Sequence, residues 1–377
     1  MPRSANKKAP NPAPVGLYIH IPFCGVKCGY CDFYSLPGTA RQKEDYTRAV
    51  MRALKGWSGK LNRTADTLYI GGGTPTQLDS AQLSRIITAA RQDFSIADGE
   101  ITAEANPQKN LSGYFKDMRT AGVNRISLGL QSANDRELTW LSRKHSPQDV
   151  TAAVAAAKTS GIDNISLDLM LGLQGQMLQS LRESIEFCLR REPTHISCYL
   201  LKIEPGTRFY QSRENFSLPD ENRLCELYLY ACETLEKHGF GQYEISNFAR
   251  PGYESRHNLK YWRAREYLGV GAAAHSFIDN RRFYYRPELS GFIAGAEPVP
   301  DGEYGGFEEY FMLGLRLSEG VDLSECGEML NEADKQAILK KAAPMQRTGL
   351  LEISGDTIRL TPQGFLVSNR IIGELIL

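Results

Sequence analysis

Three cysteines near the start of the chain carry the strongest chemical signal. Cys24, Cys28 and Cys31 stand in the spacing Cys-x3-Cys-x2-Cys. Three thiolates on one short loop can hold three irons of a four-iron cluster, which leaves the fourth iron without a protein ligand. Such an iron can chelate a small molecule, whereas a structural zinc site is closed by four protein ligands. The spacing therefore predicts a 4Fe-4S cluster with one open iron.

A zinc site with a distant fourth ligand is the alternative interpretation. His20 could supply that ligand, but no second Cys/His pair with metal-ligand spacing follows in the sequence. The other cysteines are scattered: Cys188, Cys198, Cys225, Cys232 and Cys326. Cys188 and Cys198 lie in apolar runs, which is typical of small buried side chains. We therefore favour the cluster over zinc.

Short apolar strands alternate with helical segments after the cysteines. Six strands are expected, at 17–21, 67–70, 100–105, 125–130, 164–170 and 195–201. A helical segment follows each of them, and this βα alternation predicts parallel strand pairing. A doubly wound open sheet and an incomplete β/α barrel both satisfy the pattern.

The placement of the polar motifs favours the barrel. They lie at or near the C-terminal ends of successive strands: the cysteine loop, Gly71-Gly72-Gly73-Thr74-Pro75, Glu104, Gln131 and Asp168. Chemistry gathered on one rim from consecutive strands is typical of a barrel, while an open sheet concentrates its site at one switch point. We predict an incomplete (β/α)6 barrel over residues 15–242.

The rest of the chain differs in composition from the predicted barrel. Residues 1–14 are polar and proline-rich, and we expect a flexible leader there. Residues 243–304 are rich in glycine, aromatic residues and arginine and are expected to form a connecting region. Residues 305–377 combine helical segments with a hairpin over 350–360, which predicts a small α+β, winged-helix-like domain.

Charge and hydropathy narrow the function classes. Lys+Arg and Asp+Glu number 44 each, so the formal net charge is zero. This balance argues against a nucleic-acid protein that works through a global basic field. No apolar run approaches the roughly 18 residues of a membrane helix, and the N-terminus lacks the apolar core of a secretory signal. We expect a cytoplasmic protein that binds no nucleic acid.

The cysteine segment resembles a known family. Tyr18-Ile19-His20-Ile21-Pro22-Phe23-Cys24 and Cys28-Gly29-Tyr30-Cys31-Asp32-Phe33 are similar to the radical S-adenosylmethionine (SAM) superfamily. Within it, the chain resembles the group of oxygen-independent coproporphyrinogen III oxidases and their haem-chaperone paralogues, over nearly its whole length after the leader. The resemblance implies that SAM binds the open iron through its amino and carboxylate groups. The reduced cluster can then cleave SAM to methionine and a 5′-deoxyadenosyl radical.

The resemblance also implies a set of SAM contacts. They are Tyr18, Gly72, Gly73, Thr74, Glu104, Gln131, Arg143 and Asp168. Glu104 suits a ribose hydroxyl, and Arg143 can pair with a carboxylate bidentately. Asp168 is a charge inside an apolar strand, which is costly unless it is paired. The alternatives are a plain turn for the glycines, a surface carboxylate for Glu104 and a solvated helix arginine for Arg143.

Two features separate chaperones from oxidases in this group. The oxidases carry a further cysteine two residues after the third ligand, where this chain has Phe33. The segment His257-Asn258-Leu259-Lys260-Tyr261-Trp262 matches the HNxxYW motif of the haem-binding chaperones. Its imidazole can ligate iron, and its aromatic rings can cover a porphyrin. His257 is thus the predicted haem ligand, with a core histidine as the alternative and His275 as the next candidate.

Further residues bear on the haem prediction. Three arginines near the motif could meet haem propionates: Arg256, Arg263 and Arg265. The chain departs from the chaperones at Leu171-Gly172-Leu173-Gln174, where they usually have His-Gly-Leu-Pro. That departure puts in doubt any role of the missing histidine and proline.

The resemblance implies a haem chaperone that delivers haem to apo-haemoproteins such as respiratory enzymes. Its implied partners are haem, the acceptor proteins and a low-potential electron donor, and a homodimer is compatible with it. A coproporphyrinogen III oxidase is the alternative. A radical enzyme acting on a non-tetrapyrrole substrate is a third interpretation.

Overall fold

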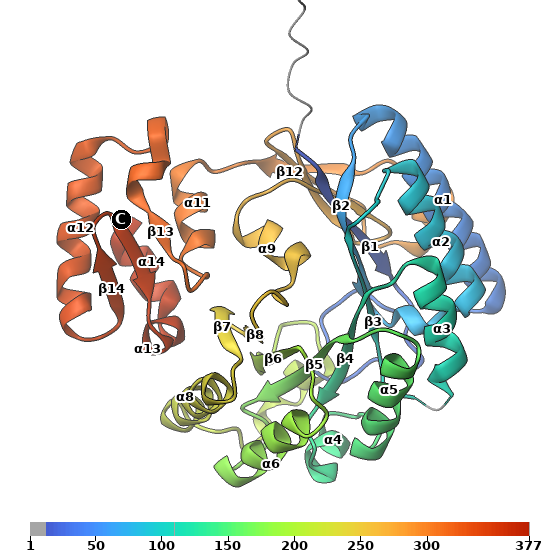
Figure 1. The fold of residues 1–377 in the computed structure, drawn as a ribbon, viewed down its shortest axis with the longest axis horizontal. Helices are drawn as coiled ribbons and strands as arrows, with labels where there is room; N and C mark the ends of the chain where they lie inside the picture. The colour runs from blue at the N-terminus through green and yellow to red at the C-terminus, as the bar shows by residue number, and fades with distance from the viewer. Residues whose placement is uncertain (1–12, 109, 377) are drawn as a thin grey trace, which may run out of the picture.

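The computed structural model describes residues 13–108 and 110–376, so the expected leader lies almost wholly outside the described residues. A large curved sheet of 12 strands forms the body of the protein, and a separate three-stranded sheet lies near the C-terminus (Figure 1). Within the described part of the chain, no helix is long and apolar enough to cross a membrane.

Six parallel strands form the centre of the large sheet, in sequence order. They are β1 (Val15–Ile21), β2 (Ala65–Gly72), β3 (Glu100–Ala105), β4 (Arg125–Gln131), β5 (Asn164–Leu171) and β6 (His195–Leu200). The helices between and after them are α1 (Ala40–Leu61), α2 (Ser80–Asp93), α3 (Leu111–Ala121), α4 (Asp135–Trp140), α5 (Pro147–Thr159), α6 (Leu178–Leu189), α7 (Arg208–Gln211) and α8 (Glu221–Lys237). Most of these helices cover the convex face (Figure 1). The predicted incomplete β/α barrel is confirmed.

The alternation of side chains along the strands explains how a hydrophobic core and a polar cavity share one sheet. Successive strand residues point to opposite faces. On β1, Leu17 and Ile19 are fully buried in the core beneath the helices, while Tyr18 between them points to the concave side. On β5, Leu167 and Leu169 are buried in the same core, and Asp168 points inward. Polar residues at every second position therefore face the barrel interior.

The region predicted as a connector extends the sheet at both ends. β7 (Gly241–Glu244) and β8 (Asn247–Ala249) form an antiparallel pair beside β6. β9 (Tyr267–Val270) pairs in parallel with β1. It is followed outward by β10 (His275–Ile278), β11 (Arg281–Tyr284) and β12 (Val299–Glu303), with α10 (Leu289–Ile293) between β11 and β12. Helix α9 (Arg256–Trp262) lies between the two extensions, against β2 (Figure 1).

The C-terminal domain has the predicted winged-helix-like organisation. Its helices are α11 (Phe307–Gly314), α12 (Glu332–Arg347), α13 (Pro362–Leu366) and α14 (Ser368–Ile376). Its strands are β13 (Val321–Asp322), β14 (Leu351–Ser354) and β15 (Thr357–Leu360), in the order β13-β15-β14. β14 and β15 form the expected hairpin, and Gly355 takes a φ of 61° at its turn. That backbone angle favours glycine.

Candidate functional site

A cavity of about 410 Å³ opens where the C-terminal ends of the parallel strands meet the cysteine loop. It is lined by all three cysteines and six of the eight predicted SAM contacts: Cys24, Cys28, Cys31, Gly73, Thr74, Glu104, Gln131, Arg143 and Asp168. Residues far apart in the sequence therefore converge on one rim, as barrel geometry requires.

The cysteine loop is held against its neighbours by several contacts. The Sγ of Cys24 lies 3.2 Å from the Oγ1 of Thr74, and the Nη1 of Arg143 lies 3.6 Å from the Sγ of Cys28. The backbone N–H of Phe209 donates to the carbonyl of Gly29 at 2.9 Å. Burial raises the pKa of Cys31 to about 11. Iron binding at this thiol must therefore release a proton.

His20 does not provide a zinc ligand in this arrangement. Its Nδ1 lies 3.0 Å from the hydroxyl of Tyr18, and its Nε2 lies 2.9 Å from the carbonyl oxygen of Tyr34. Among residues 13–108 and 110–376, no three His, Cys, Asp or Glu side chains are grouped to hold a single metal ion. Three cysteines around one cavity fit a larger cluster better.

The glycine run brings the end of β2 close to the cysteine loop. A Cβ on Gly73 would lie 2.7 Å from the carbonyl oxygens of Ile21 and Phe23. Gly72 has a φ of 103°, and its N–H donates to the Oε2 of Glu104 at 3.2 Å. These glycines are thus required by a close approach of backbones and by a left-handed conformation.

Two half-buried carboxylates give the cavity its negative side. The Oε1 of Glu104 accepts a hydrogen bond from the hydroxyl of Tyr69 at 2.8 Å. Burial, reinforced by Asp168, raises the pKa of Glu104 to about 7. Asp168 accepts hydrogen bonds from the hydroxyls of Ser127 at 3.1 Å and Ser166 at 3.2 Å, and burial raises its pKa as well. Both carboxylates can accept hydrogen bonds from a ligand's hydroxyl or ammonium groups.

Arg143 supplies the positive side of the cavity. Its Nη2 donates to the carbonyl of Gly129 at 3.0 Å, and its buried Nε has no hydrogen-bond partner among the described residues. An arginine with unused donors beside a cavity suits a ligand carboxylate. The three thiols, this guanidinium and the two carboxylates therefore fit a 4Fe-4S cluster with SAM bound beside it.

Other cavity residues were not singled out from the sequence. Asn106 donates to the Oγ1 of Thr74 at 2.9 Å, while Tyr69, Ser127 and Tyr199 also line the cavity. Strand alternation could have indicated Tyr69, because it is two residues from Gly71 on β2. Asn106 stands in the same Glu-Ala-Asn-Pro segment as Glu104.

Three predicted residues do not line the cavity: Tyr18, Gly72 and His257. His257 is 0% exposed, and both of its ring nitrogens are engaged. Its Nδ1 lies 2.8 Å from the Oγ1 of Thr67, and its Nε2 lies 2.8 Å from the hydroxyl of Tyr261. Burial, with a contribution from Lys260, lowers its pKa to about 3, so the ring is neutral.

The second haem-ligand candidate lies elsewhere, at the exposed first residue of strand β10, whose other residues are buried. The ring of His275 stacks on Tyr284 with centroids 5.0 Å apart, and its Nδ1 lies 3.3 Å from the Oδ2 of Asp301. Of the three arginines predicted to meet propionates, Arg263 pairs with Glu319 at 2.9 Å. The structure does not bring these residues to the cysteine-lined cavity.

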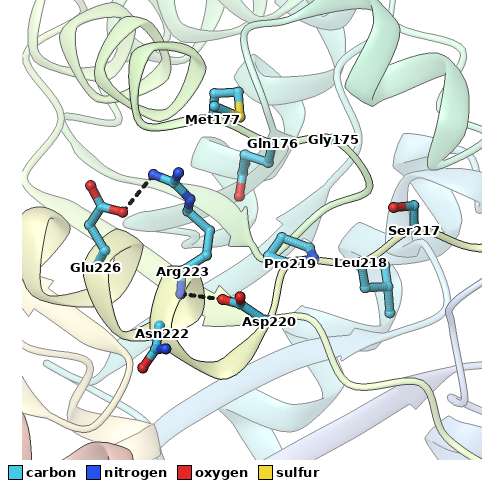
Figure 2. Close-up of a pocket in the computed structure, with 10 residues that line it drawn as sticks. All are labelled: Gly175, Gln176, Met177, Ser217, Leu218, Pro219, Asp220, Asn222, Arg223 and Glu226. Atoms are coloured by element: carbon cyan, nitrogen blue, oxygen red, sulfur yellow. Dashed lines mark hydrogen bonds and ion pairs between the residues drawn. The ribbon is translucent and has the colours of Figure 1, made fainter.

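A second cavity, of about 430 Å³, lies between the loop after β5 and the start of α8 (Figure 2). The Arg223 side chain pairs with Glu226 at 2.5 Å, and its backbone N–H donates to Asp220 at 2.8 Å. The loop contains the segment that departs from the family. Within this loop, the Oε1 of Gln176 accepts a hydrogen bond from the backbone N–H of Gly172 at 2.7 Å. The four departing residues do not themselves line this hollow, which is bordered by the next three residues of the loop, Gly175, Gln176 and Met177.

Family models match both the barrel and the C-terminal domain of the chain. The Radical SAM superfamily matches residues 18–188, and the HemN C-terminal domain matches residues 307–367. The fold is similar to that of coproporphyrinogen III oxidase (HemN) from Escherichia coli, a radical SAM enzyme. The TM-score is 0.82 at 22% identity, over 96% of this chain and 90% of that chain.

Relatives described as heme chaperone HemW match along almost the full length. The protein of Mycobacterium tuberculosis H37Rv is 34% identical over 98% of this chain and 96% of its own. The Bacillus subtilis protein is 34% identical over 95% of this chain and 98% of its own. For the Escherichia coli K12 protein the identity is also 34%, over 95% and 97%. With its cysteine loop, partial barrel and C-terminal domain, the chain belongs to the HemW family of radical SAM proteins.

Proposed function

We propose that this protein is a haem chaperone with a SAM-binding 4Fe-4S core. It binds haem and passes it to apo-haemoproteins, such as respiratory enzymes, in the cytoplasm. The observation that carries the proposal is the 34% identity to proteins described as heme chaperone HemW, over at least 95% of this chain. A similarity spread over the whole chain includes the segments outside the barrel as well as the SAM core.

The cavity supports the SAM-binding part of the proposal. Cys24, Cys28 and Cys31 would hold the cluster, whose bound SAM supplies radical chemistry when a low-potential donor provides an electron. Arg143 would bind the SAM carboxylate, and Glu104 would accept hydrogen bonds from the ribose. In this assignment Asp168 remains a further acceptor on the polar edge of the ligand.

Phe33 supports the chaperone over the oxidase. It lies on the wall of the cavity with 60% of its surface exposed, at the position where the resemblance places an additional cysteine in the oxidases. A phenyl ring offers neither a thiol nor a proton to a substrate, so a function of that cysteine cannot be performed there. Coproporphyrinogen III oxidation stays as the second candidate because the overall fold matches that of HemN.

Haem ligation by His257 requires a rearrangement. Iron can reach a ring nitrogen only after His257 leaves Thr67 or Tyr261, because both nitrogens are engaged inside the protein. His275 is more exposed and is the alternative ligand. The haem spectra of His257→Ala and His275→Ala would identify the residue, because an axial ligand sets the spectrum.

The test combines cluster assembly, haem titration and an oxidase assay on one anaerobic sample. The wild-type protein should assemble the cluster, bind haem and leave coproporphyrinogen III unchanged when SAM and a reductant are supplied. Cys24→Ala, Cys28→Ala and Cys31→Ala should lose the cluster absorbance. Cys225→Ala is the matched control, because Cys225 is a free cysteine that does not line the cavity. Formation of protoporphyrinogen over multiple turnovers would contradict the chaperone function and favour the oxidase.

A further inference from the structure

Tyr69 on β2 lines the cavity and also contacts His257 on helix α9, which carries the His257 to Trp262 motif. We propose that Tyr69 is a positioning residue that couples Glu104 to His257, so that SAM binding and the release of His257 from its buried site oppose each other. This inference rests on the proposed function, since it assumes SAM at Glu104 and haem iron at His257. It adds a physical link between the two ligands.

The first half of the link joins Tyr69 to the cavity. Its hydroxyl donates to the Oε1 of Glu104 at 2.8 Å, and the N–H of Gly72 holds the other carboxylate oxygen at 3.2 Å. A Cβ on Gly71 would lie 2.8 Å from the carboxyl carbon of Glu104, so this carboxylate is packed closely against β2. Its direction therefore depends on where the Tyr69 hydroxyl lies.

The second half joins Tyr69 to helix α9. The ring of His257 stacks on the ring of Tyr69, with centroids 5.4 Å apart and planes inclined by 28°. Thr67, which lies 2.8 Å from the Nδ1 of His257, is two residues before Tyr69 and so points to the same face of β2. The ring of Tyr69 also packs against the ring of Tyr18, with centroids 6.3 Å apart. The ring of His257 therefore helps to hold the ring of Tyr69 in place.

The backbone of α9 is also tied to the barrel. The carboxylate of Glu100 accepts the N–H groups of Arg256 at 3.1 Å and His257 at 3.0 Å. Glu100 and Glu104 lie four residues apart on β3, so they share the interior face. Any movement of α9 that frees His257 must disturb groups on the two strands that hold Glu104.

These contacts predict that the coupling between SAM binding and haem binding is negative. Bound SAM would hold Glu104, and through it Tyr69, in the arrangement that packs His257. Haem ligation would remove His257 and leave one side of the Tyr69 ring unsupported. The affinity for each ligand should therefore fall when the other is bound, by the same factor, since coupling is reciprocal. Typical coupling between sites is roughly 5- to 150-fold.

The test is a pair of titrations on the reconstituted protein: haem with and without saturating SAM, and SAM with and without haem. Each ligand should weaken the other by roughly 5-fold or more. Tyr69→Phe keeps the ring but loses the hydrogen bond to Glu104, and it should reduce the coupling factor. Tyr114→Phe is the matched control, since it loses one hydroxyl hydrogen bond, to the carbonyl of Leu78, away from both sites.

A further variant separates coupling from simple haem ligation. His257 does not line the cavity, so a residue that only ligates haem should leave SAM binding unchanged when haem is absent. In the coupled arrangement, His257→Ala weakens SAM binding without haem, and His257→Phe restores it because a ring again supports Tyr69. Cluster absorbance should be equal in all variants.

The outcomes distinguish the inference from the function on which it rests. If the wild-type protein binds both ligands with independent affinities, the coupling is wrong and the chaperone stands. If it fails to bind either haem or SAM, the proposed function itself fails, and the coupling fails with it. If Tyr69→Phe keeps the full coupling factor while Tyr114→Phe behaves identically, the Tyr69 hydroxyl does not carry the link.

Discussion

Glu104 has an unusual electrostatic setting for a carboxylate. It accepts hydrogen bonds from Tyr69 and Gly72, yet burial raises its pKa to about 7, and Asp168 adds to that rise. An isolated glutamate ionises near pH 4.3, so most carboxylates have finished titrating well below neutrality. Only the ionised form offers both oxygens as acceptors. Any ligand that depends on Glu104 should therefore bind in a pH-dependent way near pH 7.

This setting predicts a pH profile for SAM binding. The carboxylate is mostly protonated at pH 6 and mostly ionised at pH 8, so SAM affinity should be roughly tenfold weaker at pH 6. Isothermal titration of the cluster-loaded protein at both pH values would measure it. Glu104→Gln cannot ionise, and its profile should be flatter. Parallel profiles for the wild type and Glu104→Gln would exclude Glu104 as the titrating contact.

Helix α9 shows how a short element is placed by its partners. With seven residues, it is too short to be stable alone. Glu100 holds its first N–H groups, His257 inserts between Thr67 and Tyr261, and Lys260 pairs with Asp66 at 2.8 Å. Each partner belongs to the barrel or to α9 itself. Polar contacts therefore fix the position of α9 against the barrel, and one of them requires a neutral His257 ring.

The buried, neutral His257 predicts that the folded protein loses stability in mild acid. The pKa of His257 is lowered to about 3 in the folded protein, whereas an unfolded histidine titrates near 6.5. Between these values the unfolded state binds more protons, so the free energy of unfolding falls as the pH falls. One such histidine contributes up to about 1.4 kcal/mol per pH unit.

Urea unfolding at pH 6.5 and pH 5.5 would test this contribution. The pH dependence should be shallower in His257→Phe, which has no titrating ring. The buried His195, whose pKa is also lowered by burial, remains in both proteins and keeps the comparison matched. An unchanged slope would mean that His257 is accessible to protons in the folded state.

At the scale of the whole molecule, the C-terminal domain is joined to the edge of the large sheet. The N–H of Ile245 donates to the carbonyl of Arg316 at 3.0 Å, and the N–H of Ser318 donates to that of Tyr243 at 3.0 Å. Leu317, between these two contacts, is 2% exposed. Backbone hydrogen bonds and a buried leucine thus fasten the two parts together.

This contact predicts a contrast between two neighbouring substitutions. Leu317→Ala removes buried apolar contacts and should lower the free energy of unfolding by about 2–5 kcal/mol. Glu319→Ala breaks an exposed ion pair with Arg263 and should change it by less than about 1 kcal/mol. Urea or thermal unfolding would measure both. Equal effects would mean that Leu317 fastens the domain no more strongly than the exposed ion pair does.

The local features of this protein could be predicted from its amino-acid sequence. The cysteine spacing predicted three thiols around one site, and the alternation of strands and helices predicted the partial barrel. Both signals are short-range, because a motif and a strand–helix period are contained in neighbouring residues. The hairpin of β14 and β15 was predictable for the same reason, since Gly355 marks its turn.

The contacts between segments that are distant in the sequence became visible only in the folded chain. β9 pairs with β1 although about 250 residues separate them, and such pairing leaves no periodic signal in the sequence. The motif predicted His257 as a haem ligand, but packing against β2 determined that its ring is buried and fully engaged. Tyr69 is an ordinary strand residue in the sequence. Its contacts with Glu104 and His257 exist because two neighbouring strands and a distant helix fold around one interior.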